Sequence, residues 1–122
     1  MLEQLIPVAE DARIRVPDRP LPIALVGAGA IVEHAHLPAY RAHGFHVLGV
    51  YDIDAARATS LADRFGIARV YGTLDELLSD TDVGVVDIAV PPWVQPDILR
   101  RVVGANKHAL CQKPFALDPG TA

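Results

Sequence analysis

The ten residues IALVGAGAIV, at positions 23–32, decide the fold. The apolar run IALV is typical of a short buried strand, and the Gly-x-Gly that follows lets the backbone turn tightly into a helix. Apolar residues at Ile31, Ala35 and Ala39 then recur at helical spacing. Because proline lacks a backbone donor, Pro38 is expected to kink or break that helix early. The segment therefore predicts a strand, a glycine turn and a helix in succession.

The same alternation continues along the chain. Further strands are predicted at 46–52, 68–72, 83–90 and 108–112. Helices are predicted at 54–66, at 73–80, and from near Pro96 to 107. Apolar strands that alternate with helices indicate a parallel sheet covered on both faces. The expected fold class is α/β, a doubly wound, mostly parallel sheet of the Rossmann type.

Two of the predicted helices carry clear end signals. Asp54 and Gly66 are the expected N-cap and C-cap of the helix at 54–66. Thr73 and Glu76 have the spacing of a capping box at the start of the next helix.

Length and composition limit the alternatives. A chain of 122 residues fits one domain, with a proline-punctuated N-terminal arm at 1–20 and a folded part at 21–122. The net charge of −4 opposes nucleic-acid binding, which needs a basic face. The single cysteine, Cys111, allows no internal disulfide and indicates a reducing compartment. Without a signal-peptide pattern or a long apolar stretch, we expect a soluble cytoplasmic protein with no membrane partner.

Two loops at predicted strand ends indicate a dinucleotide site. Gly27 and Gly29 let the backbone approach a pyrophosphate that rests on free N–H groups of the following helix. Asp52 ends the second strand, where an acidic residue accepts hydrogen bonds from the adenosine ribose and repels a 2′-phosphate. A surface aspartate is the alternative for Asp52, but its combination with the glycines favours a dinucleotide, NAD rather than NADP.

No metal site is expected. His34 and His36 are two residues apart, which places them on different faces of a helix. No histidine has zinc-like spacing with Cys111, and a thiol in mid-strand is more typical of a buried, inert side chain.

The aromatic residues carry weaker signals. Tyr40 and Phe45 are interpreted as packing groups. Trp93 follows two prolines at a strand end, where an aromatic side chain either covers a cofactor or caps the core, and the sequence leaves both open.

The chain resembles the N-terminal domain of the Gfo/Idh/MocA oxidoreductases, which include glucose–fructose oxidoreductase and inositol dehydrogenase. The segments that carry the resemblance are GAGAIVEHAHLPAY at 27–40, YDIDAARA at 51–58, FGIARVYGTLDELL at 65–78, DIAVPPWV at 87–94 and ANKHALCQKPFAL at 105–117. The last is the most specific, because it is similar to the Glu-Lys-Pro signature of the family.

The resemblance implies roles for individual residues. Lys113 falls on the lysine that the family directs at the nicotinamide and the substrate hydroxyl, and Pro114 on the proline that fixes that turn. The expected cofactor-binding residues are Gly27, Gly29, Ala30, Ile31, Asp52, Val90, Pro91, Pro92, Trp93 and Gln112.

Three residues depart from the family pattern. Val32 stands where alanine or glycine is usual, and Gln95 where a histidine often follows the proline pair. Gln112 replaces the signature glutamate. Because a neighbouring carboxylate stabilises an ammonium ion, its loss is expected to ease deprotonation of Lys113.

The function implied by the resemblance is hydride transfer between a nicotinamide cofactor and a sugar, cyclitol or related hydroxy compound. A second domain is expected to supply the substrate pocket and a dimerisation sheet, so this chain alone is expected to be inactive and to self-associate. The alternative is a non-catalytic module that binds a nucleotide or a partner. A methyltransferase is a more distant alternative, because the Lys-Pro turn and the proline pair do not suit it.

Overall fold

The computed structural model describes residues 18–113, so most of the predicted arm and Pro114 lie outside the described residues. In chain order the elements are β1 (Ile23–Val26), η1 (Val32–His36), α2 (Leu37–Ala42), β2 (Val47–Tyr51), α3 (Ala55–Phe65), β3 (Arg69–Val70), α4 (Leu74–Ser79), β4 (Val85–Ile88), α5 (Gln95–Gly104) and β5 (His108–Cys111). The five strands are all parallel and lie in the order β3-β2-β1-β4-β5. This arrangement confirms the predicted doubly wound α/β fold.

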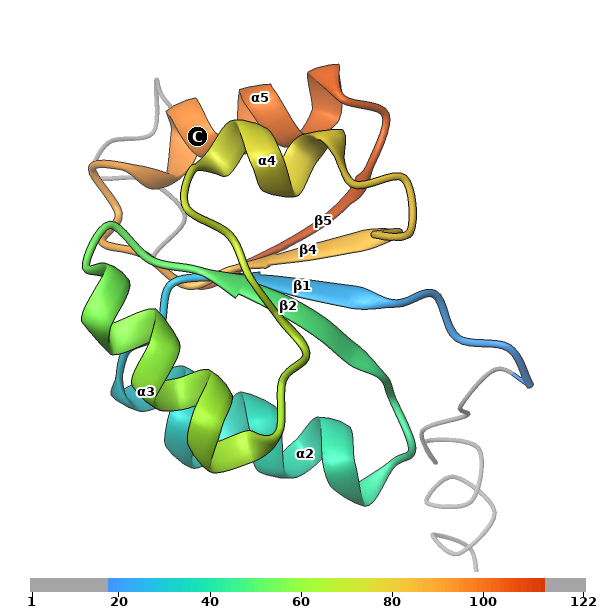
Figure 1. Ribbon diagram of the computed structural model, residues 1–122. Helices are drawn as coiled ribbons and strands as arrows, with labels where there is room; N and C mark the ends of the chain where they lie inside the picture. Colours follow the sequence, from blue (N-terminus) through green and yellow to red (C-terminus); the bar gives the residue numbers. More distant parts are fainter. Residues whose placement is uncertain (1–17, 114–122) are drawn as a thin grey trace, which may run out of the picture.

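Helices cover both faces of the sheet. In Figure 1, α2 and α3 lie below the sheet, and α4 and α5 lie above it. Alternate residues of β1 enter different cores: Ile23 and Leu25 pack with residues of α3, whereas Ala24 and Val26 pack with residues of α4. All four β1 side chains are buried, which explains why this strand shows no polar alternation.

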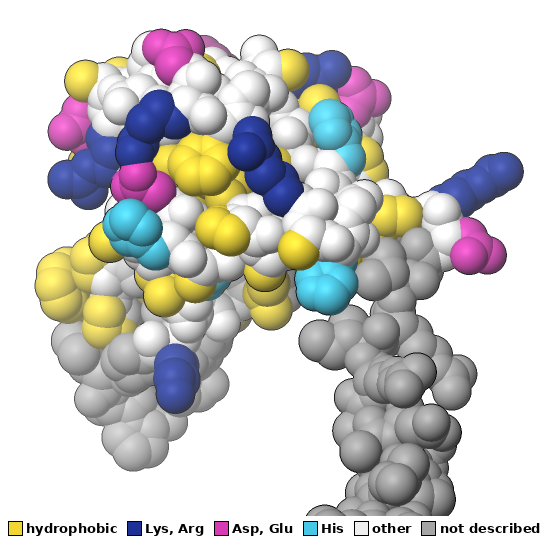
Figure 2. All heavy atoms as spheres, turned by 90° about the horizontal axis from the view of Figure 1, so that it is seen from below, with side chains coloured by type: hydrophobic (Ala, Val, Ile, Leu, Met, Phe, Trp, Pro, Cys, Tyr) yellow, Lys and Arg dark blue, Asp and Glu magenta, His cyan; other side chains and the backbone are white. Residues whose placement is uncertain are grey.

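The lower helical layer presents a mixed surface. Figure 2 views the molecule from below and shows acidic, basic and histidine side chains interspersed with apolar ones on this face. Such a mixture is typical of a solvent-facing layer whose apolar stripe points inward.

The first helical segment is irregular. The residues of η1 form a π-helical turn, in which the Leu37 N–H donates to the Val32 carbonyl, and the α-helical turns of α2 follow. Pro38 lies in the first turn of α2, where its missing N–H is tolerated. The predicted break near Pro38 is therefore wrong: the backbone stays helical from η1 into α2, and only the hydrogen-bond pairing changes from π- to α-helical. Val32 is fully buried in the lower core.

The predicted caps are confirmed. The Asp54 carboxylate accepts from the N–H groups of Ala56 and Arg57, and Gly66 ends α3 in the left-handed conformation at φ +67°. The Thr73 hydroxyl accepts from the Glu76 N–H at 3.1 Å.

The capping box at the start of α4 differs in one hydrogen bond from the expected pattern. The Glu76 carboxylate accepts from the N–H of Gly72 rather than from that of Thr73.

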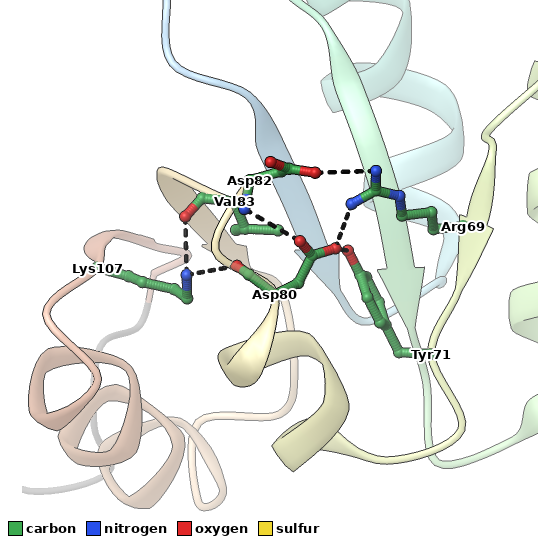
Figure 3. A network of polar contacts seen from close by, with 6 residues as sticks. All are labelled: Arg69, Tyr71, Asp80, Asp82, Val83 and Lys107. Carbon is green, nitrogen blue, oxygen red and sulfur yellow. Dashed lines mark hydrogen bonds and ion pairs between the residues drawn. The ribbon is translucent and has the colours of Figure 1, made fainter.

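A polar network closes the edge of the sheet where the strands begin (Figure 3). One carboxylate oxygen of Asp80 accepts from Arg69 at 2.5 Å and from the Tyr71 hydroxyl at 2.7 Å, and the other accepts from the Asp82 N–H at 3.0 Å. The Lys107 ammonium donates to the carbonyls of Asp80 and Val83, both at 2.8 Å. The network ties β3 to the loops that precede β4 and β5.

Replacing Asp80 by asparagine is expected to destabilise the fold. The hydrogen bonds from Tyr71 and then Arg69 lower the pKa of Asp80 from 3.8 to about 2. Because this pKa is depressed in the folded state, the ionised carboxylate contributes about 1–2 kcal/mol of stability above pH 4 and loses it as the pH falls toward 2. Urea unfolding at a series of pH values from 7 to 2 measures the free energy of unfolding of the parent and of Asp80→Asn. The difference between the two free energies is expected to shrink as the pH falls.

The control for this experiment is Asp82→Asn. The Asp82 side chain is 64% exposed, against 16% for Asp80, and accepts from Arg69 Nη2 at 3.0 Å. Its replacement is expected to cost less than about 1 kcal/mol, as for exposed ion pairs. Equal losses in the two variants would contradict the central role given to Asp80.

Candidate cofactor site

The sheet register brings the predicted site together at one edge. Val26 of β1 is paired with Tyr51 of β2 and with Ile88 of β4, and Ile88 is paired with Cys111 of β5. The carboxyl ends of four strands are therefore level, and the next residue of each strand enters the same edge. Those next residues are Gly27, Asp52, Ala89 and Gln112. Strand order reverses between β1 and β4, and ligands of doubly wound folds bind at such a switch point.

Glycine occupies positions 27 and 29 of the turn for different reasons. Gly27 has φ +107°, and a Cβ atom there would lie 2.2 Å from the Ala89 carbonyl oxygen, so the fold itself requires glycine. At Gly29 a Cβ atom would meet nothing within 4 Å, so no protein atom requires glycine there. The free space beside Gly29 suits the close approach of a ligand.

A cavity of about 530 Å³ opens at this edge. Seven of the predicted cofactor-binding residues line this cavity: Gly27, Gly29, Ile31, Asp52, Val90, Pro91 and Gln112. The predicted residues that do not line it are Ala30, Pro92, Trp93 and Lys113. The structure therefore brings most of the predicted set around one cavity and leaves the rest at its margin.

Seven cavity residues were missed from the sequence: Val26, Tyr51, Ile53, Arg57, Ala89, Val94 and Ile98. Ile53 follows Asp52 and is 94% exposed, which is unusual for an isoleucine. An isoleucine between two aspartates, directly after a strand, was the available signal. Arg57 lies one turn further along, in the first turn of α3, and its signal was its spacing from Asp52.

The Asp52 carboxylate joins two loops of the cavity. One oxygen accepts from the Ala28 N–H and the other from the Asp54 N–H, both at 2.8 Å. Asp52 thus holds the glycine turn against the end of β2. A carboxylate oxygen has two lone-pair directions, so Asp52 keeps capacity to accept bonds from a ligand.

Trp93 and Lys113 lie beside the cavity. Trp93 is 68% exposed, so it does not cap the core. Lys113 is also exposed, and its backbone N–H donates to Gln112 Oε1 at 3.1 Å. The Gln112 backbone is fixed by the buried Gln95, whose amide donates to the Gln112 carbonyl at 2.8 Å.

A buried polar cluster lies under the end of β5. Asp87, in the middle of β4, is 1% exposed, and one of its oxygens accepts from the Tyr40 hydroxyl at 2.6 Å and lies 2.7 Å from His36 Nδ1. The other ring nitrogen of His36 lies 2.6 Å from the Gln112 amide nitrogen. Burial, and then the hydrogen bond to Asp87, raises the pKa of Tyr40.

Sequence reasoning did not find this cluster. His36 was considered only as a metal ligand, and Tyr40 only as a packing group. Tyr40 does pack edge-on against Phe45, with ring centroids 6.0 Å apart, but its hydroxyl also binds Asp87. The available signal was an aspartate inside an apolar strand, since a buried carboxylate requires partners.

Cys111 is half-buried against the upper core. Burial, and then the charge of Asp87, raises the pKa of its thiol, which fits the predicted inert side chain. Within residues 18–113 no group of three histidine, cysteine or acidic side chains is arranged to hold a metal ion. No helix in that part of the chain is long and apolar enough to cross a membrane.

Comparison with known proteins gives the family. Residues 21–122 match the model of the oxidoreductase family with an NAD-binding Rossmann fold. Inositol 2-dehydrogenase 1 of Paenarthrobacter aurescens is 34% identical over 103 residues, which cover 84% of this chain and 31% of that protein. An uncharacterized oxidoreductase of Rhizobium meliloti, ORF334, is 38% identical over 95 residues, which cover 77% of this chain and 28% of that protein. The chain thus spans about a third or less of these relatives.

Comparison with solved structures supports the same family. An oxidoreductase from Thermotoga maritima superposes with a TM-score of 0.81 at 26% identity, covering 84% of this chain and 32% of that one. A 3-ketoreductase from Actinomadura kijaniata in complex with NADP and TDP-benzene gives 0.76 at 28% identity, covering 84% and 32%. Levoglucosan dehydrogenase in complex with NADH and L-sorbose gives 0.73 at 29% identity, covering 80% and 28%. This chain belongs to the Gfo/Idh/MocA family of oxidoreductases and carries its NAD-binding Rossmann fold.

Proposed function

We propose that the chain binds NAD in the cavity at the switch point and serves an oxidoreductase that acts on the CH–OH group of a sugar, a cyclitol or a related compound. The observation that carries the proposal is the free space at Gly29 inside a cavity formed by four strand ends. Because no protein atom requires glycine at this position, the close approach of a ligand in the cavity accounts for it.

The residues present fit a dinucleotide. Backbone N–H groups beside Gly29, at the start of the first helical segment, would hold the pyrophosphate. Asp52 would accept from the adenosine ribose, with Ile53 and Arg57 along the adenine. Val90, Pro91 and Gln112 would line the nicotinamide end. The bound nicotinamide supplies the hydride acceptor, and the chain supplies its orientation and an apolar surrounding.

NAD is proposed over NADP because a carboxylate at the ribose repels a 2′-phosphate. Among the structural neighbours one complex contains NADP and another contains NADH. Arg57 lines the same cavity, and its guanidinium would favour a phosphate. The preference therefore depends on the balance between Asp52 and Arg57.

Lys113 is proposed as the group that polarises or helps to deprotonate the reacting hydroxyl. It follows the cavity residue Gln112 at the end of β5 and is exposed, as a substrate-facing group must be. Relatives named as inositol dehydrogenases, and structural neighbours named as a ketoreductase and a levoglucosan dehydrogenase, support a hydroxy-compound substrate. Because hydride transfer requires a held substrate, we propose that a second domain supplies the rest of the pocket.

Lys113→Met in the natural gene product tests this role. We expect NAD reduction with at least one member of a panel of inositols, hexoses and nucleotide sugars. The variant is expected to lower kcat by roughly 100-fold or more, the usual loss when a proton-transfer group is removed. NADH affinity is expected to stay within about twofold, because Lys113 does not line the cavity. A variant with the kcat of the parent would contradict the assignment.

A second candidate function is a module without turnover that binds a nucleotide or a partner. It is supported by two exposed apolar side chains, Val103 on α5 at 58% and Leu110 on β5 at 52%. The same side chains support the proposal that the chain self-associates. Light scattering over a range of concentrations, together with the substrate panel, separates the two functions: a module would assemble without reducing NAD.

A further inference from the structure

We infer that His36 is an uncharged positioning residue, protonated on Nδ1 and accepting at Nε2 from Gln112, which fixes the Gln112 amide and the Lys113 backbone at the rim of the cavity. The inference extends the proposed function to a residue outside the cavity. It rests on the hydrogen-bond requirements at the two ends of one imidazole.

Asp87 is the partner of one ring nitrogen of His36, Nδ1. Its Oδ2 lies 2.7 Å from His36 Nδ1 and accepts from the Tyr40 hydroxyl at 2.6 Å. A buried carboxylate only accepts hydrogen bonds, so Nδ1 must carry a proton. The pair is well shielded, since the exposed fractions of the two side chains are 14% for His36 and 1% for Asp87.

The Gln112 amide is the partner of the other ring nitrogen, Nε2. Its Oε1 accepts from the Lys113 backbone N–H at 3.1 Å, which sets the orientation of the amide group. Its nitrogen then faces His36 Nε2 at 2.6 Å. An amide nitrogen only donates, so Nε2 must offer a lone pair. Together the two ends allow one state of the ring, neutral with the proton on Nδ1.

The local fold places the ring between its partners. His36 is the last residue of the π-helical turn η1, and a π turn accommodates one more residue than an α turn. The partners come from distant strands, Asp87 from the middle of β4 and Gln112 from the end of β5. His36 thus links the first helical segment to the strand end that carries Lys113.

The identity of residue 112 determines the charge of this ring. A glutamate there would place an acceptor oxygen against the bare Nε2, and the imidazole would be bracketed by two carboxylates. An opposite charge on each side favours the protonated ring. Glutamine, where the family signature has glutamate, therefore keeps His36 neutral.

Within the part of the chain that the structure describes, two other ionisable groups lie near the ring and Asp87. Tyr40 on α2 and Cys111 on β5 both have raised pKa values and stay neutral at pH 7.5. On its own element, Glu33 is ion-paired with Arg64 and lies 4.0 Å from His34.

NMR of the ¹⁵N-histidine-labelled chain at pH 7.5 tests the inference, with the His36 signals assigned by their loss in His36→Gln. Long-range ¹H–¹⁵N spectra of the parent are expected to show the neutral Nδ1–H tautomer at His36. In Gln112→Glu the ring is expected to carry both protons, whereas His34, which is 75% exposed, should not change. A parent ring protonated on Nε2 or on both nitrogens, or an unchanged ring in Gln112→Glu, would overturn the inference. The parent spectrum alone decides the tautomer if that variant does not fold.

A second measurement rests on the proposed function. His36→Asn is expected to weaken NADH binding by about fivefold, the factor that one positioning hydrogen bond supplies. His34→Asn is the matched control and should bind as the parent does. If the parent binds no NADH, the proposed function fails while the NMR result still decides the state of His36.

Discussion

Gly29→Ala is expected to weaken NADH binding by roughly 5- to 150-fold, the equivalent of about 1–3 kcal/mol for one methyl group forced into a close contact. Its thermal stability is expected to equal or exceed that of the parent. No protein atom lies within 4 Å of the added methyl group, and alanine restricts the unfolded chain more than glycine. Calorimetric titration with NADH and thermal unfolding measure the two quantities. The separation of affinity from stability is the essential part of the result.

Two other glycines serve as controls. Gly104 lies at the end of α5, also with nothing within 4 Å, so Gly104→Ala makes the same chemical change away from the cavity. It should bind NADH as the parent does. Gly27→Ala should instead lose stability by about 3 kcal/mol or more, because its methyl group would overlap the Ala89 carbonyl at a positive φ. Unchanged NADH affinity in Gly29→Ala would mean that the pyrophosphate does not pass this turn.

Asp52→Ala is expected to lower NADH affinity by roughly 10- to 100-fold, since charged hydrogen bonds are worth about 1.5–3 kcal/mol. NADPH affinity should fall less or rise, because the carboxylate that repels the 2′-phosphate is gone and Arg57 remains in the cavity. The ratio of the two dissociation constants, from parallel titrations, is the quantity to compare. An unchanged ratio would contradict the assignment of Asp52 to the ribose.

Asp52 also has a structural role, which the controls must separate. Its carboxylate accepts from the N–H groups of Ala28 and Asp54, so its loss frees the glycine turn. Asp52→Asn keeps an acceptor oxygen and should recover part of the stability but not the discrimination against NADPH. Asp63→Ala removes an equal charge from an exposed position of α3 outside the cavity and should change neither.

Much of this fold is encoded locally, which is why the sequence predicts it. The strand at 23–26, the glycine turn after it, and the caps at Asp54 and Thr73 depend on neighbours within a few residues. The position of the cavity follows from topology alone, because parallel strands end at one edge. Seven of the predicted cofactor residues accordingly line one cavity.

The buried polar cluster was missed because it depends on contacts between distant segments. His36 and Asp87 are 51 positions apart, and His36 and Gln112 are 76 apart, so no local pattern relates them. The π-helical turn that ends at His36 is an irregularity that helical periodicity does not reveal. Trp93 is a case in which the local sequence allowed two outcomes. Its neighbours in the sequence suited both a buried and an exposed ring, and in the folded structure the ring is exposed.

The most direct test of the central claim uses the single tryptophan of the chain. Trp93 lies beside the cavity residues Pro91 and Val94 and is exposed, so its emission can be transferred to bound NADH. We expect saturable energy transfer with one NADH per chain, displaced by NAD and by ADP-ribose, strongly weakened in Gly29→Ala and retained in Gly104→Ala. Transfer that does not saturate, or that is unchanged in Gly29→Ala, would contradict a dinucleotide site at this turn.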